Sequence, residues 1–139
     1  MVGPILKLYY GRRNRLGLAE PVEVRVMEAG SIKPQVLPSG AVGKFEWGDD
    51  SLPTLHLSHA ILQDFAGEAI AKLYYKRFAH IFLVGLLAGE WHICGADIAG
   101  VLARYNWLPR VTAALVGGAG LALAGVLFQQ TLRNPLAAP

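Results

Sequence analysis

The feature that most constrains this chain is an uncharged apolar run near its C-terminus. Val111–Phe128 holds eighteen consecutive residues without a charged side chain, and about twenty such residues in a helix cross the hydrocarbon core of a bilayer. The wider stretch Leu108–Leu132 supplies the missing length, and Arg110 and Arg133 stand near its two ends. Guanidinium groups at such positions can extend to the lipid headgroups. We therefore expect a membrane-spanning helix here.

The run is unusually rich in small residues. In a soluble helix each interior glycine costs up to about 1 kcal/mol relative to alanine, whereas in lipid the helical hydrogen bonds cannot be exchanged for water and the helix persists. Small residues spaced four apart share one helix face and let a second backbone approach closely. That face carries Ala114, Gly118 and Ala122, and Gly125 extends it. The pattern predicts a helix packed within a bundle of membrane helices; the alternative is a buried helix of a soluble core.

The same stretch contains a block of motifs: LPRV, a Gly/Ala-rich span, AGVLFQQ and RNPLAAP. In this order they resemble the permease family of bacterial ABC importers for iron-siderophores, haem and cobalamin, above all its ferric-hydroxamate members. The resemblance covers about residues 80–139. The motif residues that carry it include Pro109, Arg110, Gly118, Gly125, Gln129, Arg133, Asn134 and Pro135.

This resemblance implies a transport component that is not an enzyme. Such a permease alternates between inward and outward access in the cytoplasmic (inner) membrane, while a separate ABC ATPase subunit hydrolyses ATP and a periplasmic binding protein delivers the iron-siderophore substrate. The chain has no GxxxxGK[ST] phosphate-binding loop, which agrees with ATP being bound by another subunit. We expect no cofactor in this chain. It would be a fragment, packed against other permease helices and unable to transport alone. Asn134-Pro135 would end the helix, because proline disfavours helix at the residue before it.

A second apolar run, residues 78–89, is too short to span a bilayer alone. It is either a membrane helix truncated near residue 77 or an interfacial or re-entrant segment. Together with the longer run it suggests an antiparallel membrane hairpin. Lys72, Lys76 and Arg77 precede it, and basic residues flanking membrane segments favour the cytoplasmic side. The N-terminal half is therefore expected in the cytoplasm, and Arg133 at the exit of the second segment would suit the same side.

Charge divides the chain into two parts. Residues 1–77 hold ten of the thirteen Lys and Arg and eight of the ten Asp and Glu, so a polar segment, 1–77, precedes an apolar one, 78–139. In the first part, strands are predicted at 4–10 and 32–38, a helix at 20–29, and a helical pattern from His59 to Tyr75 with Ser58 as its N-cap. The predicted fold class is a small, degenerate thioredoxin-like α/β half followed by the membrane hairpin.

The N-terminal half also resembles the opening of a glutathione transferase, through PILKLYY…GLAEPVEVRVMEAG and SLPTL…LSHAILQDFA. That resemblance implies that Tyr10 would activate a thiol, Pro53 would be a cis-proline meeting the glutathione backbone, and Ser58 would bind its γ-glutamyl carboxylate. Glutathione binding is thus the alternative function. A third alternative is a chimeric chain with no function as a unit.

Other site classes find little support in the sequence. The net charge of +3 is small and dispersed, so we expect no nucleic-acid partner. His56 and His59 are three apart, but the expected helix start at Ser58 separates them, and His80 and His92 add no ligand set at metal spacing. We therefore expect no metal. The single cysteine, Cys94, is expected to be a small buried apolar residue.

Overall fold

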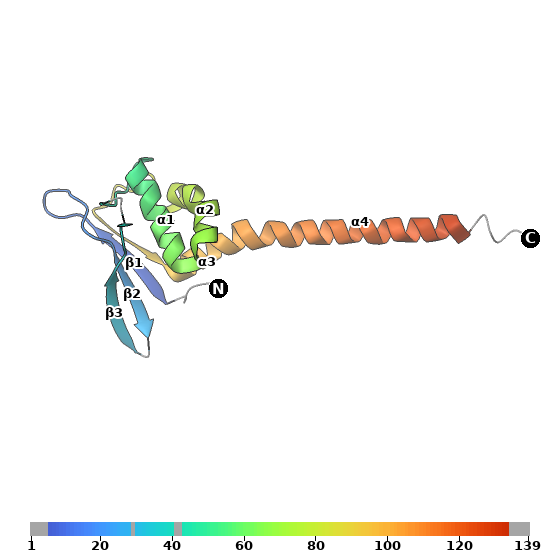
Figure 1. Ribbon diagram of the computed structural model, residues 1–139, viewed down its shortest axis with the longest axis horizontal. Coiled ribbons are helices and arrows are strands. Elements are labelled where there is room, and N and C mark those ends of the chain that lie inside the picture. The colour runs from blue at the N-terminus through green and yellow to red at the C-terminus, as the bar shows by residue number, and fades with distance from the viewer. Residues whose placement is uncertain (1–5, 29, 41–42, 134–139) are drawn as a thin grey trace, which may run out of the picture. The chain divides into compact units, whose positions relative to one another are not determined.

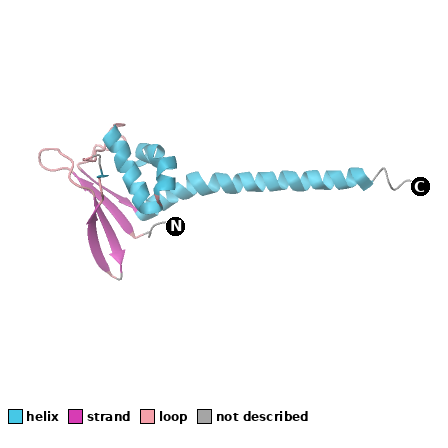
Figure 2. Cartoon of the chain, in the orientation of Figure 1, coloured by secondary structure: helices cyan, strands magenta, loops and turns pink. Residues whose placement is uncertain are grey.

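The computed structural model describes residues 6–28, 30–40 and 43–133, and its chain forms two compact units, Met1–Ala99 and Gly100–Pro139. The first unit is a mixed α/β domain and the second is helical (Figures 1 and 2). The elements are β1 (Lys7–Arg12), β2 (Glu23–Glu28), β3 (Ser31–Val36), α1 (Leu52–Ala66), α2 (Glu68–Phe82), β4 (Glu90–Cys94), α3 (Gly95–Leu102), the π-helical turn η2 (Ala103–Trp107) and α4 (Leu108–Arg133).

The first unit is built on a four-stranded sheet in the order β3-β2-β1-β4, with every neighbouring pair antiparallel. Tyr9 in the central strand β1 lies opposite Val24 of β2 and Ile93 of β4. Residues paired in this way point to the same face of a sheet, and all three are buried. The helices α1 and α2 lie on one side of the sheet (Figure 1), and α1 contributes buried Leu57 and Ile61 to the core.

The segment expected to be a helix at 20–29 is a strand instead. Val22, directly before β2, and Val24 and Val26 within it are buried, and they alternate with Glu23 and Arg25. Alternation with period two places every second side chain on one face of a strand, and β-branched valines fit a pleated sheet better than a helix. The helical spacing of Val22 and Val26 was therefore the wrong period for this stretch.

The strands at 4–10 and 32–38 are confirmed as β1 and β3, whereas the thioredoxin-like arrangement is not confirmed. Its characteristic unit needs a helix between two parallel strands, and here β1 runs directly into antiparallel β2.

The edge strand β3 is exposed along its whole length. Just beyond the paired strands, Leu37 donates its N–H to Val22 O. By the alternation of the ladder, Pro34 stands at a position whose N–H would face solvent. Proline is tolerated there because that position requires no donor.

The helical pattern from His59 to Tyr75 is confirmed, but as two helices. Gly67, at φ +91°, separates α1 from α2, a backbone conformation that costs glycine far less than other residues. The first helix starts at Leu52 rather than after Ser58, with Pro53 in its first turn, where a missing N–H costs nothing.

Residues 78–94 belong to the α/β unit. Phe78 and Leu83 are buried in its core, and Trp91 and Ile93 of β4 are buried against the same face of the sheet. Backbone hydrogen bonds hold the connection: the Gly48 N–H donates to Leu83 O at 2.9 Å, and the Arg13 N–H donates to Gly89 O at 2.7 Å. The two compact units therefore meet after Ala99, not at the boundary expected after Arg77.

A buried polar group ties the sheet to α1. The Tyr9 hydroxyl donates to Asp64 Oδ2 at 2.7 Å, and Lys7 Nζ approaches the same oxygen at 2.9 Å. Burial raises the pKa of Tyr9 well above its ordinary value, and the hydrogen bond to Asp64 and the charge of Asp64 add to the shift. Asp64 lies outside the sheet, so this contact fixes the position of α1 along β1.

We predict that Tyr9→Phe lowers the stability of the α/β unit by about 1.5–3 kcal/mol at pH 7, because a hydrogen bond to a charged group is lost. In the native state Tyr9 stays protonated, whereas in the unfolded state it ionises near pH 10. The stabilisation from Tyr9 is therefore complete below pH 10 and declines as pH rises further. Urea unfolding of the micelle-solubilised chain between pH 7 and 11 should show the gap between wild type and variant narrowing above pH 10. A gap that stays constant with pH would contradict this account.

We also predict that Gly11→Ala destabilises the unit by about 1–3 kcal/mol through overpacking. A Cβ atom at Gly11 would come within 2.6 Å of Trp91 Nε1 and closer still to the ring carbons. Gly89→Ala is the matched control, since a Cβ there meets nothing within 4 Å. Near-UV circular dichroism of the tryptophans reports the urea midpoint, and equal midpoints for the two variants would rule out the close packing of Trp91 on β1.

Candidate functional site: the apolar helix α4

The start of α4 follows from one proline. Pro109 has no N–H and its ring collides with the carbonyl four residues earlier, so the regular α-helical pattern is interrupted around it. The interruption takes the form of the π-helical turn η2, after which Leu108 donates its N–H to Ala103 O, five residues back. From Leu108 the helix continues for 26 residues to Arg133.

The side chains of α4 are apolar and uncovered. The helical segment Gly95–Leu132 is, among the described residues, the one helix long and apolar enough to cross a membrane, with a mean hydropathy of 2.1 and none of its most apolar window buried. Leu115, Leu121 and Phe128 are each more than 60% exposed. A soluble core helix would bury such residues, whereas the most apolar window of this helix is not buried by any described residue.

The two threonine hydroxyls of α4 are satisfied by the helix itself. Thr112 donates its hydroxyl to Leu108 O or Pro109 O at 3.1 and 2.9 Å, and Thr131 donates to Leu127 O at 2.8 Å. Gln129 lies one residue beyond the uncharged run. Such internal bonds remove the cost of placing a hydroxyl in hydrocarbon. The helix can therefore enter lipid with its threonines.

The small face predicted from sequence lies on α4 and is exposed in the described part of the chain. Ala114, Gly118 and Ala122 lie within the helix, and a Cβ built on Gly118 or Gly125 meets nothing within 4 Å. Arg110 is exposed in the first turn, while the side chain of Arg133 and the whole of Asn134 and Pro135 lie outside the described residues. The packing role of this face stays a prediction.

The structure separates the residues of the glutathione alternative. Tyr10 points to the sheet face opposite Tyr9, where the Arg25 guanidinium lies 4.9 Å from its ring centre. Ser58 is buried in the middle of α1 and donates its hydroxyl to Tyr75 O. Pro53 lies in the first turn of α1, and no described peptide bond is cis. A thiol at Tyr10 could not also reach Ser58, because the sheet lies between them.

The histidines are placed differently from the sequence-based expectation. His56 and His59 share the helix α1, because that helix starts before both of them. His80 approaches Asp50 at 3.7 Å, and His92 is exposed on β4. Within the described ranges no three His, Cys, Asp or Glu side chains are grouped so that they could hold a metal ion. Cys94 is half-buried at the end of β4.

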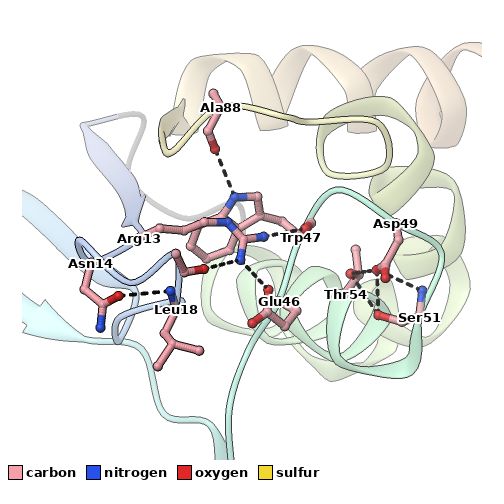
Figure 3. Close-up of polar contacts among 10 residues, drawn as sticks. Arg13, Asn14, Leu18, Glu46, Trp47, Asp49, Ser51, Thr54 and Ala88 are labelled. Carbon is pink, nitrogen blue, oxygen red and sulfur yellow. Dashed lines mark hydrogen bonds and ion pairs between the residues drawn. The ribbon is translucent and has the colours of Figure 1, made fainter.

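The best-organised polar cluster of the α/β unit was missed from sequence (Figure 3). Asp49 Oδ1 accepts hydrogen bonds from the Ser51 hydroxyl at 2.6 Å and the Thr54 hydroxyl at 2.9 Å. These bonds, that of Ser51 above all, hold the pKa of Asp49 below its usual value. The spacing Asp-x-Ser-x-x-Thr directly before a helix was the available signal, because hydroxyls and carboxylates at a helix start satisfy its free N–H groups.

A second part of the cluster joins three loops. Arg13 pairs with Glu46 at 3.0 Å, donates to Trp47 O at 3.0 Å and lies 4.6 Å from the centre of the Trp47 ring. Trp47 in turn donates its indole N–H to Ala88 O and packs edge-on against Trp91. Each of these groups is engaged by another part of the same unit. The arrangement therefore stabilises loops and offers no pair of groups suited to acid–base catalysis.

Two protein families match different parts of the chain, and their matches overlap. Residues 78–139 match the FecCD transport family, and residues 9–104 match DUF6166, a family of unknown function. The match to DUF6166 includes residues of all four strands and the helices α1 and α2. No comparison supports the glutathione transferase resemblance for this half. No solved structure matches the chain.

Curated relatives of the C-terminal part are iron permeases. The iron(3+)-hydroxamate import system permease protein FhuB of Salmonella typhimurium is 48% identical over 63 residues, which are 42% of this chain and 9% of that protein. FhuB of Escherichia coli is 64% identical over 36 residues, 26% of this chain and 6% of that protein. The Fe(3+)-citrate import system permease protein YfmE of Bacillus subtilis is 56% identical over 39 residues, 28% of this chain and 11% of that protein.

The chain thus spans only about a tenth or less of the length of these relatives. The resemblance to iron-siderophore permeases predicted from LPRV, AGVLFQQ and RNPLAAP is confirmed for the C-terminal segment. The DUF6166 match extends over more than half of the chain and over its folded α/β unit. The protein therefore belongs to the DUF6166 family, and its residues 78–139 have the sequence of a FecCD-type permease segment.

Proposed function

We propose that this chain is a membrane-spanning fragment of an ABC importer permease for iron-siderophore-type substrates. The observation that carries the proposal is α4, an uncovered apolar helix that lies in the segment matching FecCD. At 1.5 Å per residue, the uncharged run Val111–Phe128 is about 27 Å long, close to the thickness of about 30 Å for the hydrocarbon core. Exposing this helix to water would be costly, and a bilayer removes that cost.

A single crossing fits the fold better than the expected hairpin. Insertion of residues 78–89 would withdraw Phe78, Leu83 and the adjoining strand β4 from the α/β core.

The bacterial inner membrane is the proposed location, with the α/β unit in the cytoplasm. Arg104 and Arg110 precede the span and Arg133 follows it, which favours this orientation under the positive-inside rule. With one crossing, the end of α4 then lies on the periplasmic side.

The small face of α4 is the proposed contact to the remaining helices of such a permease. Helices in lipid associate through close backbone packing, and Gly118 and Gly125 leave room for it. A separate ATPase subunit and a periplasmic binding protein complete the proposed importer, so this chain requires neither ATP nor another cofactor. One helix cannot enclose a substrate pathway, and we therefore propose that the fragment does not transport and is not an enzyme.

We predict that the full chain stays in the membrane pellet after an alkaline carbonate wash. Leu121→Arg should release a large part of it, because an arginine at the centre of a span costs about 2.5–3.5 kcal/mol. Leu16→Arg is the control, since Leu16 is 83% exposed in a loop of the α/β unit, and this variant should remain in the pellet. Complete release of the unaltered chain would contradict a membrane span.

The packing role has its own test. The chain is co-expressed with an FhuB chain that lacks the matched segment, and capture of one by the other from detergent is measured. We predict that Gly118→Leu reduces capture at least about fivefold, since the larger side chain keeps the helices apart. Gly120→Leu adds the same volume on the opposite side of α4 and should leave capture unchanged. Equal capture with both variants would overturn the proposed face, while the carbonate result would still stand.

A further inference from the structure

The helices α1 and α2 line an open pocket whose role α4 and the importer proposal do not explain. A pocket of about 350 Å³ lies on the α/β unit, lined by Leu52, Leu55, His56, His59, Lys72 and Tyr75. Its volume is at the lower end of the range for small-molecule sites. Two leucines and an aromatic ring form apolar walls, and a lysine and two histidines supply nitrogen atoms. This combination suits a small molecule with one apolar end and one polar end.

The nitrogen groups of the pocket already converge on a carboxylate. Glu68 Oε1 lies 3.2 Å from Lys72 Nζ and 3.7 Å from His59 Nε2. The geometry of Lys72 and His59 is therefore one that accommodates a carboxylate oxygen between them. Glu68 and Lys72 are both well exposed, and an exposed ion pair of this kind contributes at most about 1 kcal/mol. A ligand carboxylate can replace Glu68 at little cost.

One residue of the pocket lining, His56, also has a ring nitrogen that solvent does not reach. His56 Nδ1 is buried and makes no hydrogen bond within the described part of the chain. Buried polar atoms in proteins are nearly always paired with protein, water or ligand. His59 is held in place by its edge-on contact with the Tyr75 ring, whose centre is 5.8 Å away. The contact between His59 and Tyr75 thus holds one wall of the pocket in place. Nδ1 of His56 has no hydrogen-bond partner among the described residues.

We propose that this pocket binds a small aliphatic carboxylate. The carboxylate lies at Lys72 and His59 in place of the Glu68 side chain, and the aliphatic end packs against Leu52, Leu55 and the Tyr75 ring. Glu68 then acts as an internal competitor that occupies the anion position when no ligand is bound. The proposal predicts opposite effects for two neighbouring substitutions, which a purely structural salt bridge would not produce.

The test uses the full chain in zwitterionic micelles, labelled with ¹³C at its histidines, and titrated with butyrate. Butyrate should shift the His59 and His56 signals in a saturable way, acetate should bind more weakly for lack of apolar contact, and butylammonium should not bind. We expect Lys72→Met to weaken butyrate binding about fivefold and Glu68→Gln to tighten it about threefold. Lys44→Met, which removes an exposed lysine outside the pocket, is the matched control and should change nothing.

Two results would overturn the proposal: equal shifts with butyrate and butylammonium, or weaker binding in Glu68→Gln than in the wild type. Near-UV circular dichroism of Trp47 and Trp91 shows whether each variant is folded. If Lys72→Met loses its tertiary signal, the Glu68→Gln titration still decides, because it predicts a gain in affinity. The pocket lies wholly in the α/β unit, so failure here leaves the importer proposal untouched.

Discussion

The pairing of β4 with β1 determines which residues of this chain are free to enter a membrane. β1 is a central strand, and without β4 one of its edges and the adjoining core would be open to water. Five large apolar side chains from the segment after Arg77 are buried in the α/β unit: Phe78, Leu83, Trp91, Ile93 and Ile98. At about 1.5–3 kcal/mol for each buried side chain, their removal would cost as much as the whole stability of a typical domain, about 5–15 kcal/mol.

This cost of removing buried side chains favours the α/β fold over membrane insertion for the residues that match both families. Residues 78–104 match both FecCD and DUF6166, yet they can adopt only one environment at a time. In the structure residues 78–99 are folded as the last part of the α/β unit. Residues 78–89 are also too short to span a bilayer and are interrupted by His80. Under the proposed single crossing, the permease-like segment contributes α4 as its spanning helix, and the α/β unit keeps its fourth strand.

The sequence predicted some parts of this architecture well because their signals were strong and local. The uncharged run Val111–Phe128 determines α4 almost by itself, since few structures accept eighteen apolar residues without charge. β2 was assigned the wrong period, because Val22 and Val26 fit a helix and a strand equally well at a spacing of four. The alternation of β4, with Trp91 and Ile93 inward, is confined to five residues and was overlooked between two apolar runs.

The candidate sites were harder to predict, because they depend on contacts between distant residues. Tyr10 lies on a strand as predicted, whereas Pro53 and Ser58 lie inside α1 rather than before a helix. The direction in which each side chain points depends on the sheet register and on where α1 begins. One misplaced helix start, at Ser58 instead of Leu52, separated His56 from His59 and concealed the pocket between α1 and α2. The Tyr9–Asp64 bond joins residues 55 positions apart, and a single sequence carries no local signal for such a pair.

The π-helical turn η2 has a simple role at the junction of the two parts. Residues of the α/β unit end with buried Ile98, and the uncharged run begins at Val111. Between them the helical segment must change from one-sided burial to full exposure, and Pro109 prevents a regular α-helix from continuing through the change. A π turn keeps the backbone hydrogen bonds formed across the proline. Because a helix entering lipid cannot leave backbone groups unpaired, this turn allows a soluble fold and a spanning helix to follow one another directly.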